Sequence, residues 1–175
     1  MDLTEAQRDM RQAHLAGAPA VMASALAWLL AGVVALQVST PSAVITLLAG
    51  GAMIQPAGVI LSRVLGRSGV PGAGNPLSRL ALEGAAWLVL CIPVTYAVSQ
   101  YRIHWFFPAM LLMMSGRYLT YRTIYGVRIY WFMGGLLALV AYLLAAADVA
   151  PWASAFVVAL IEFFFAVSVY VEEVR

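Results

Sequence analysis

Residues 152–171 read WASAFVVALIEFFFAVSVYV, twenty positions of which Glu162 is the only charged one. A helix rises 1.5 Å per residue, so this stretch is long enough to cross a hydrocarbon core about 30 Å thick. A charged side chain inside such a stretch is costly and is therefore uncommon without a function or a partner. The stretch thus predicts a transmembrane helix and marks Glu162 as its unusual residue.

Apolar stretches of similar length fill most of the rest of the chain. We expect transmembrane helices near 18–38, 43–62, 78–98, 104–124, 128–147 and 152–171. The 175 residues are 63% hydrophobic and only 10% charged, whereas soluble domains carry about 25% charged residues. The sequence therefore predicts an all-α integral membrane bundle of about six transmembrane helices, in a single membrane domain over residues 1–175.

The first 17 residues are polar and form a separate N-terminal segment. Its apolar residues recur at three- and four-residue steps: Leu3, Ala6, Met10 and Ala13. This spacing predicts a short amphipathic helix that lies along the membrane interface, with a solvated, frayed tail as the alternative. Thr4 and Gln7 have the spacing of a capping box at its start.

The basic residues predict the orientation of the bundle in the membrane. All ten are arginine. With the N-terminus inside, nine of them fall on or towards the cytoplasmic side and only Arg102 falls on the other. Arginine resists translocation, so this bias predicts that both termini and the loop from Gly66 to Pro76 are cytoplasmic.

Four polar residues fall at similar depth in four different predicted helices: Gln55, Glu83, Arg117 and Glu162. The rise of a helix places all four about 17–22 Å from the outer face, slightly on the cytoplasmic side of the midplane. A buried guanidinium is stable only when it is paired, and the two glutamates are candidates to neutralise Arg117. The layer predicts either a ligand site or ion pathway, or an ion-pair network that only fixes the packing of the helices.

The fourth predicted helix adds aromatic residues to this layer. Tyr118 and Tyr121 lie one and four positions after Arg117. Arginine and phenol groups together suit an anionic headgroup or ligand. An aromatic belt at the membrane boundary is the alternative. We therefore expect a ligand-binding site formed by Gln55, Glu83, Arg117, Tyr118, Tyr121 and Glu162.

Several chemistries lack the residues that they need. Without lysine there is no Schiff-base chemistry, which argues against retinal and pyridoxal proteins. The only histidines, His14 and His104, are expected on opposite sides of the membrane, and there is no zinc-protease, nucleophile-elbow or P-loop motif. We therefore expect no metal, no cofactor, no nucleic acid and no assignable catalytic residue.

Two short motifs carry a resemblance to a known family. The stretch from Gly116 to Gly126, GRYLTYRTIYG, and the step Asn75-Pro76-Leu77 after the long inner loop are similar to segments of an uncharacterised bacterial family of small six-span membrane proteins. The polar helix before the first span resembles that family as well. The resemblance implies a multi-pass protein of the bacterial inner membrane and brings no established activity with it.

Three functions remain open at this point. The first is a small-molecule or ion transporter, or a ligand-binding membrane protein, that uses the mid-membrane polar layer. The second is a membrane-embedded enzyme that acts on a lipid or isoprenoid, with Glu83 or Glu162 as general acid or base. The third is a non-catalytic subunit of a membrane complex. Expected partners are membrane lipids, a small ligand or ion, and a second copy or another membrane subunit.

Overall fold

The computed structural model describes residues 1–175, and every regular element in it is a helix. Along the chain the elements are α1 (Leu3–His14), η1 (Leu15–Gly17), α2 (Ala18–Gln37), α3 (Thr40–Val64), α4 (Pro76–Tyr101), η2 (Ile103–Trp105), α5 (Phe106–Tyr125), α6 (Ile129–Ala146) and α7 (Pro151–Val174). The prefix η marks a single turn of 3₁₀-helix. The six long helices, α2 to α7, begin and end within about three residues of the six expected stretches.

Five helical segments are long and apolar enough to cross a membrane, namely the one that contains α2, and α3, α4, α6 and α7. The remaining long helix, α5, has 20 residues and lies among them, but its arginines and tyrosines make it less apolar. Large apolar side chains such as Leu90 and Phe132 are exposed on the outer faces of the bundle. This surface suits lipid contact, and the chain is a helical membrane bundle, as expected.

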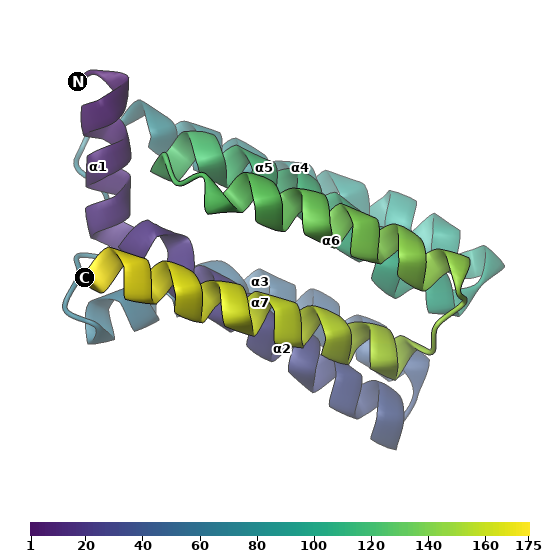
Figure 1. The fold of residues 1–175 in the computed structure, drawn as a ribbon. Coiled ribbons are helices and arrows are strands. Elements are labelled where there is room, and N and C mark those ends of the chain that lie inside the picture. Colours follow the sequence, from purple (N-terminus) through teal and green to yellow (C-terminus); the bar gives the residue numbers. More distant parts are fainter.

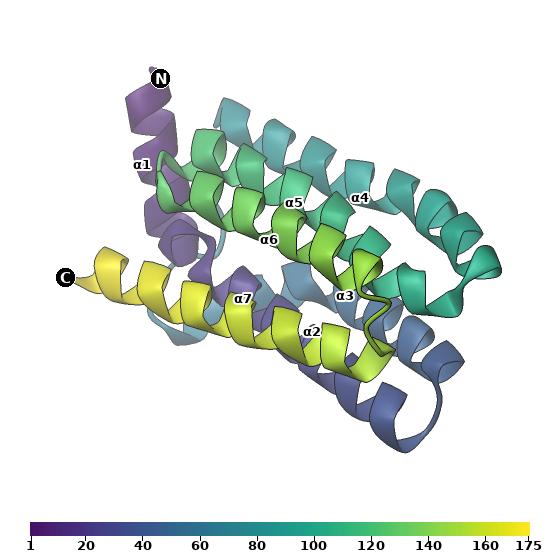
Figure 2. The same cartoon turned by 45° about the vertical axis from the view of Figure 1, so that its right-hand side comes forward.

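The long helices form two layers of three (Figures 1 and 2). In one layer α2 packs along both α3 and α7, and in the other α5 packs along both α4 and α6. Contacts between the layers are much sparser. The last helix of the chain therefore joins the first two long ones, so the layers are not the two halves of the sequence.

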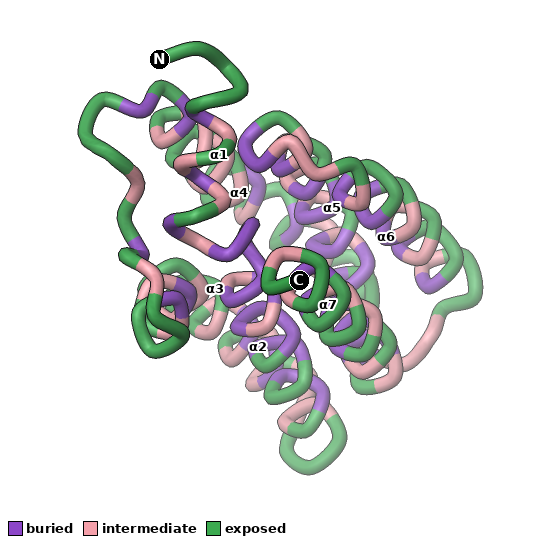
Figure 3. The backbone as a smooth tube through the Cα atoms, turned by 60° about the vertical axis from the view of Figure 1, so that its left-hand side comes forward, coloured by how far each residue is buried: buried purple, intermediate pink, exposed green.

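The helix α1 crosses one end of both layers, where the two termini also lie (Figure 1). Its apolar face, formed by Ala6, Met10 and Ala13, is buried against the protein (Figure 3). The expected amphipathic helix is present, but its apolar side faces the bundle and not the lipid. The expected capping box is wrong by two residues. The Asp2 side chain accepts from the Glu5 N–H, and the Glu5 side chain accepts from the Asp2 N–H. An ionised carboxylate is a strong acceptor for the first backbone N–H groups of a helix.

The long loop between α3 and α4 is held against α1. The Gly69 N–H donates to the Ala13 carbonyl (3.0 Å), and the Gly72 N–H donates to Asp9 (2.8 Å). The Asn75 side chain caps α4 and also donates to Ala6 and Asp9. Hydrogen bonds of the backbone and of the Asp9 and Asn75 side chains thus tie this loop and α1 into one cover at the end of the bundle.

A left-handed turn joins α1 to α2. Leu15, Ala16 and Gly17 all have positive φ, at 48°, 51° and 90°. A side chain at Gly17 would place its Cβ 2.8 Å from the ring of Tyr125, so only glycine fits there. The Tyr130 hydroxyl donates to the Ala16 carbonyl at 2.6 Å. Tyr125 and Tyr130 belong to α5 and α6. The layer of α4, α5 and α6 therefore holds the strained turn that leads into α2.

Candidate functional site

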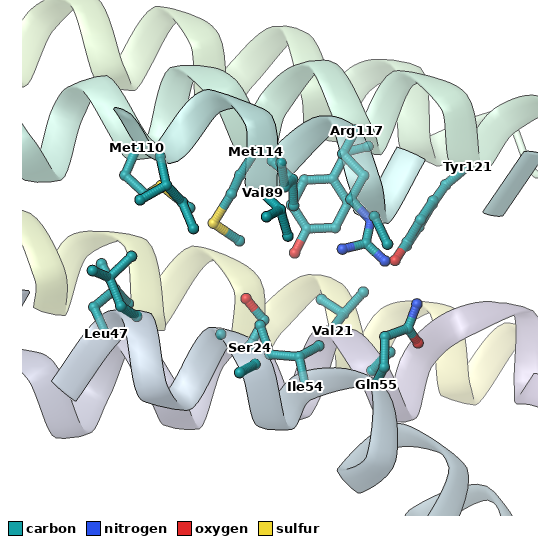
Figure 4. Close-up of a pocket in the computed structure, with 18 residues that line it drawn as sticks. Val21, Ser24, Leu47, Ile54, Gln55, Val89, Met110, Met114, Arg117 and Tyr121 are labelled. Carbon is teal, nitrogen blue, oxygen red and sulfur yellow. The ribbon is translucent and has the colours of Figure 1, made fainter. Parts of the chain in front are cut away.

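A cavity of about 240 Å³ lies between the two layers. It is bordered by α2 and α3 on one side and by α4 and α5 on the other, and most of its 18 lining residues are hydrophobic. Four of the six residues expected to bind a ligand are among them: Gln55, Arg117, Tyr118 and Tyr121. The fold therefore brings most of the expected site together around one space (Figure 4).

The Arg117 side chain extends from α5 into this cavity (Figure 4). No carboxylate lies within 4 Å of it, since the one ion pair in the chain joins Arg102 to Asp148 at the opposite end of the bundle from the termini. Its Nε atom is buried and has no hydrogen-bond partner. Its guanidinium lies 5.6 Å from the centre of the Tyr121 ring, a cation–π distance. The expected neutralisation of Arg117 by Glu83 or Glu162 is therefore wrong.

Gln55 reaches the same space from the opposite layer. Its amide points from α3 towards Arg117 and Tyr121 (Figure 4). Gln55 is exposed in the isolated chain, so it lies at the open side of the cavity. An amide both donates and accepts hydrogen bonds, so this residue suits a polar ligand of either sign.

Glu162 lies behind the cavity and not in it. Its side chain is completely buried, at 0% exposure. One oxygen accepts a hydrogen bond of 2.6 Å from the Tyr118 hydroxyl, and the other, Oε2, has no partner. Because Tyr118 lines the cavity, its phenol group connects Glu162 to that space.

Glu83 is not brought into this group. It is exposed on α4 and does not line the cavity. The depth of Glu83 along its helix agrees with the other three residues, but the rotation of α4 turns it outwards. The position of a residue along a helix does not say which way the whole helix is rotated about its axis. The sequence therefore did not indicate that Glu83 faces outwards.

Ser24 is a site residue that the sequence did not indicate. It lies on α2 in an alanine-rich stretch, and its hydroxyl faces the cavity without a hydrogen-bond partner (Figure 4). The same hydroxyl lies beside Tyr118 and Glu162. No local pattern could have distinguished it from other small residues in a transmembrane helix.

Four tyrosines surround this part of the bundle: Tyr118, Tyr121, Tyr125 and Tyr130. Tyr121 meets Tyr118, Tyr125 and Tyr130 edge-on, with ring centres 5.2–5.5 Å apart. Tyr118 and Tyr130 are stacked at 6.4 Å. Such edge-on and stacked pairs fix the orientation of the rings, so the hydroxyls beside the cavity are held in place.

The site combines one cation, several hydroxyl and amide groups, and a large apolar wall. No group of three or more metal-ligating side chains occurs in the chain. An unpaired guanidinium next to apolar surface is suited to a small anion that carries an apolar body. The arrangement is a candidate binding site, with Arg117 as its charged element.

The model of a family of unknown function, DUF7010, matches residues 3–172. This agrees with the resemblance that the stretch from Gly116 to Gly126 suggested. No curated protein and no solved structure matches the chain.

Proposed function

We propose that this chain, which belongs to the DUF7010 family of unknown function, binds a small anionic molecule in the cavity between its two layers and carries it across the membrane. The observation that carries the proposal is the Arg117 guanidinium, which reaches into an apolar cavity with no carboxylate to neutralise it. A partly buried cation without an anionic partner is unfavourable in the low-dielectric interior of a bilayer. An anionic ligand would supply the missing partner.

The dimensions of the cavity limit the size of the ligand. Its volume of about 240 Å³ lies below the range of about 300–1,000 Å³ that holds drug-sized ligands. Met110 and Met114 line it as flexible apolar side chains, which adapt to different ligand shapes. The proposed ligand is therefore a small molecule with a short apolar body and one anionic group.

The sparse contacts between the layers support transport over static binding. Alternating access needs two rigid units that move around a fixed site near the midplane. Here each layer packs closely within itself, while the cavity separates the two layers. The proposed orientation has both termini in the cytoplasm and the protein in a bacterial inner membrane, as the distribution of arginines and the family resemblance suggest.

A matched set of probes tests the binding step. Hexane-1-sulfonate, hexan-1-ol and hexyltrimethylammonium share one apolar chain and differ in the charge of the head. Titration calorimetry on the purified protein in detergent should show binding of the sulfonate that is at least about tenfold tighter than that of the other two, or about 1.4 kcal/mol. Arg117→Gln should remove this preference, whereas the exposed Arg128→Gln should keep it. Equal affinity of wild type and Arg117→Gln for the sulfonate would reject the proposal.

Uptake into liposomes tests the transport step. Vesicles that contain the wild-type protein should take up radiolabelled hexane-1-sulfonate in exchange for internal sulfonate, and vesicles with Arg117→Gln should not. Binding without exchange would limit the function to ligand binding. If the protein showed no binding and no exchange, the result would favour the role of a non-catalytic membrane subunit.

A further inference from the structure

Glu162 is the most deeply buried ionisable carboxylate of the bundle and has an incomplete set of partners. It is 0% exposed, and no arginine or histidine lies within ion-pair distance. Its Oε1 atom accepts from Tyr118, while Oε2 has no hydrogen-bond partner. This carboxylate therefore does not form a structural ion pair, and one of its oxygens has no partner. The burial of such a group needs another explanation.

A second atom without a partner lies next to it. The Ser24 hydroxyl has no hydrogen bond and lies beside Glu162 and Tyr118. An ionised carboxylate only accepts hydrogen bonds, but a carboxylic acid also donates one. With a proton on Oε2, Glu162 can donate to Ser24 Oγ, and both groups then have a partner. The Ser24 hydroxyl can likewise donate to Oε2 when Glu162 is ionised, so this pair of atoms serves both protonation states of the carboxyl group.

No cationic side chain lies within ion-pair distance of Glu162. The residues from Leu15 to Gln37, which include η1 and α2, contain no ionisable side chain. The ionisable side chains of α5 are Arg117, Tyr118, Tyr121, Arg122 and Tyr125. Of these, Tyr118 donates to Glu162, and neither arginine lies within ion-pair distance of it. From α6 the nearby phenol is Tyr130. On α7 itself the next carboxylates, Glu172 and Glu173, lie at the cytoplasmic end in the proposed orientation.

A path connects the cavity with Glu162. Ser24 and Tyr118 both line the cavity, and both lie against the carboxyl group. A hydronium ion in the cavity can pass a proton to the Ser24 hydroxyl, while the hydroxyl proton of Ser24 moves to Glu162 Oε2. The products are one water molecule and one neutral carboxylic acid, so the step is balanced, and its reversal releases the proton to the cavity.

We infer that Glu162 binds the proton that accompanies the anion held by Arg117, so that the protein carries an anion and a proton together. The coupling between the two rests on the proposed function, whereas proton binding at Glu162 does not. An anion next to Arg117 and a proton on Glu162 leave the loaded site with the charge of the resting one. Neutral loading lowers the electrostatic barrier to movement between the layers in a medium of low dielectric constant.

Infrared difference spectroscopy tests proton binding on the protein alone. Spectra of liposomes are recorded as the pH is lowered from about 9 to about 5, where ordinary surface glutamates remain ionised. The wild type should gain the C=O band of one protonated carboxyl group, and Glu162→Gln should lack it. Glu83→Gln, which changes an exposed carboxylate in another transmembrane helix, should keep it.

Tyr118→Phe should keep the band and shift its frequency, and this variant serves if Glu162→Gln does not fold. Spectra of wild type and Glu162→Gln that are the same, or an unshifted band in Tyr118→Phe, would overturn the inference.

Binding of hexane-1-sulfonate at several pH values tests the coupling, because this probe keeps its charge over the whole range. In the wild type the affinity should rise as the pH falls, by at most about tenfold per pH unit for one linked proton. In Glu162→Gln the affinity should not change with pH. A pH-dependent carboxyl band without any binding of the sulfonate would reject the proposed function and leave proton binding intact. Binding of the sulfonate that is independent of pH in the wild type would overturn the coupling.

Discussion

The two layers of the bundle differ in the way their helices pack. In the layer of α2, α3 and α7, small residues face one another. A side chain at Gly58 would meet Ala20 at 3.0 Å, and one at Gly50 would meet Ala27 at 2.8 Å. In the layer of α4, α5 and α6, interlocked tyrosines such as Tyr121 take this role. Close contact of small residues fixes two helices against each other. Large tyrosine rings instead hold their hydroxyl groups at a distance from the helix backbone. The first layer is therefore tightly packed through small residues, and the second holds Arg117, Tyr118 and Tyr121 at the cavity through interlocked rings.

The largest expected effect follows from breaking the close contact in the first layer. Gly58→Leu should lower the free energy of unfolding by about 3 kcal/mol, because the backbone of Ala20 lies 3.1 Å from the added Cβ and cannot move aside without separating α2 from α3. Unfolding in mixed micelles measures this. Gly135→Leu is the matched control, since nothing lies within 4 Å of its Cβ. Equal losses in both variants would show that the contact of α2 with α3 is not the cause.

A smaller loss should follow from removing the one hydrogen bond between the layers at Glu162. Tyr118→Phe deletes the donor to Glu162 and should cost about 1–2 kcal/mol in the same unfolding experiment, because the buried carboxyl group loses its only partner. Tyr121→Phe removes a phenol hydroxyl for which no hydrogen bond is found, and it should cost less than about 0.5 kcal/mol. A larger loss for Tyr121→Phe than for Tyr118→Phe would contradict this assignment.

The ion pair at the far end of the bundle should contribute little. Arg102 and Asp148 join the α4–η2 turn to the α6–α7 turn at 3.3 Å, and both side chains are more than half exposed. Such pairs contribute about 0.2–1 kcal/mol and are weakened by salt. Asp148→Asn should therefore change stability by less than about 1 kcal/mol, and by less still at high ionic strength. A loss that persists in molar salt would mean that Asp148 has a different role.

The smallest effect is expected between the two charges nearest to the cavity. Arg117 and Glu162 form no ion pair, so a double-mutant cycle of Arg117→Gln and Glu162→Gln should be additive within about 0.3–0.5 kcal/mol. A contact between the two charges would instead give a large coupling, because removing one partner of a buried pair costs about 3–5 kcal/mol. Measured coupling above about 1 kcal/mol would place the two side chains in contact.

The sequence by itself determined the class of the protein and the length of its helices. A stretch of twenty mostly apolar residues, such as 152–171, is long enough to span a bilayer whatever surrounds it, because each helix satisfies its own backbone hydrogen bonds. It also placed Gln55, Arg117 and Glu162 in the middle part of their helices, since this position depends only on the number of residues from the end of a helix. These properties are local, and the helices of the structure agree with them.

Only the tertiary structure decided which of these residues meet. The rotation of each helix and the choice of its neighbours depend on side-chain packing between segments far apart in the chain, which hydrophobic spacing does not encode when a helix is apolar all round. Packing turned Glu83 outwards, placed Glu162 behind Tyr118 and left Arg117 facing the cavity. It also paired α7 with α2, which set Ser24 beside Glu162. The polar residues share a depth because of the sequence, and they form one site, without Glu83, because of the way the helices pack.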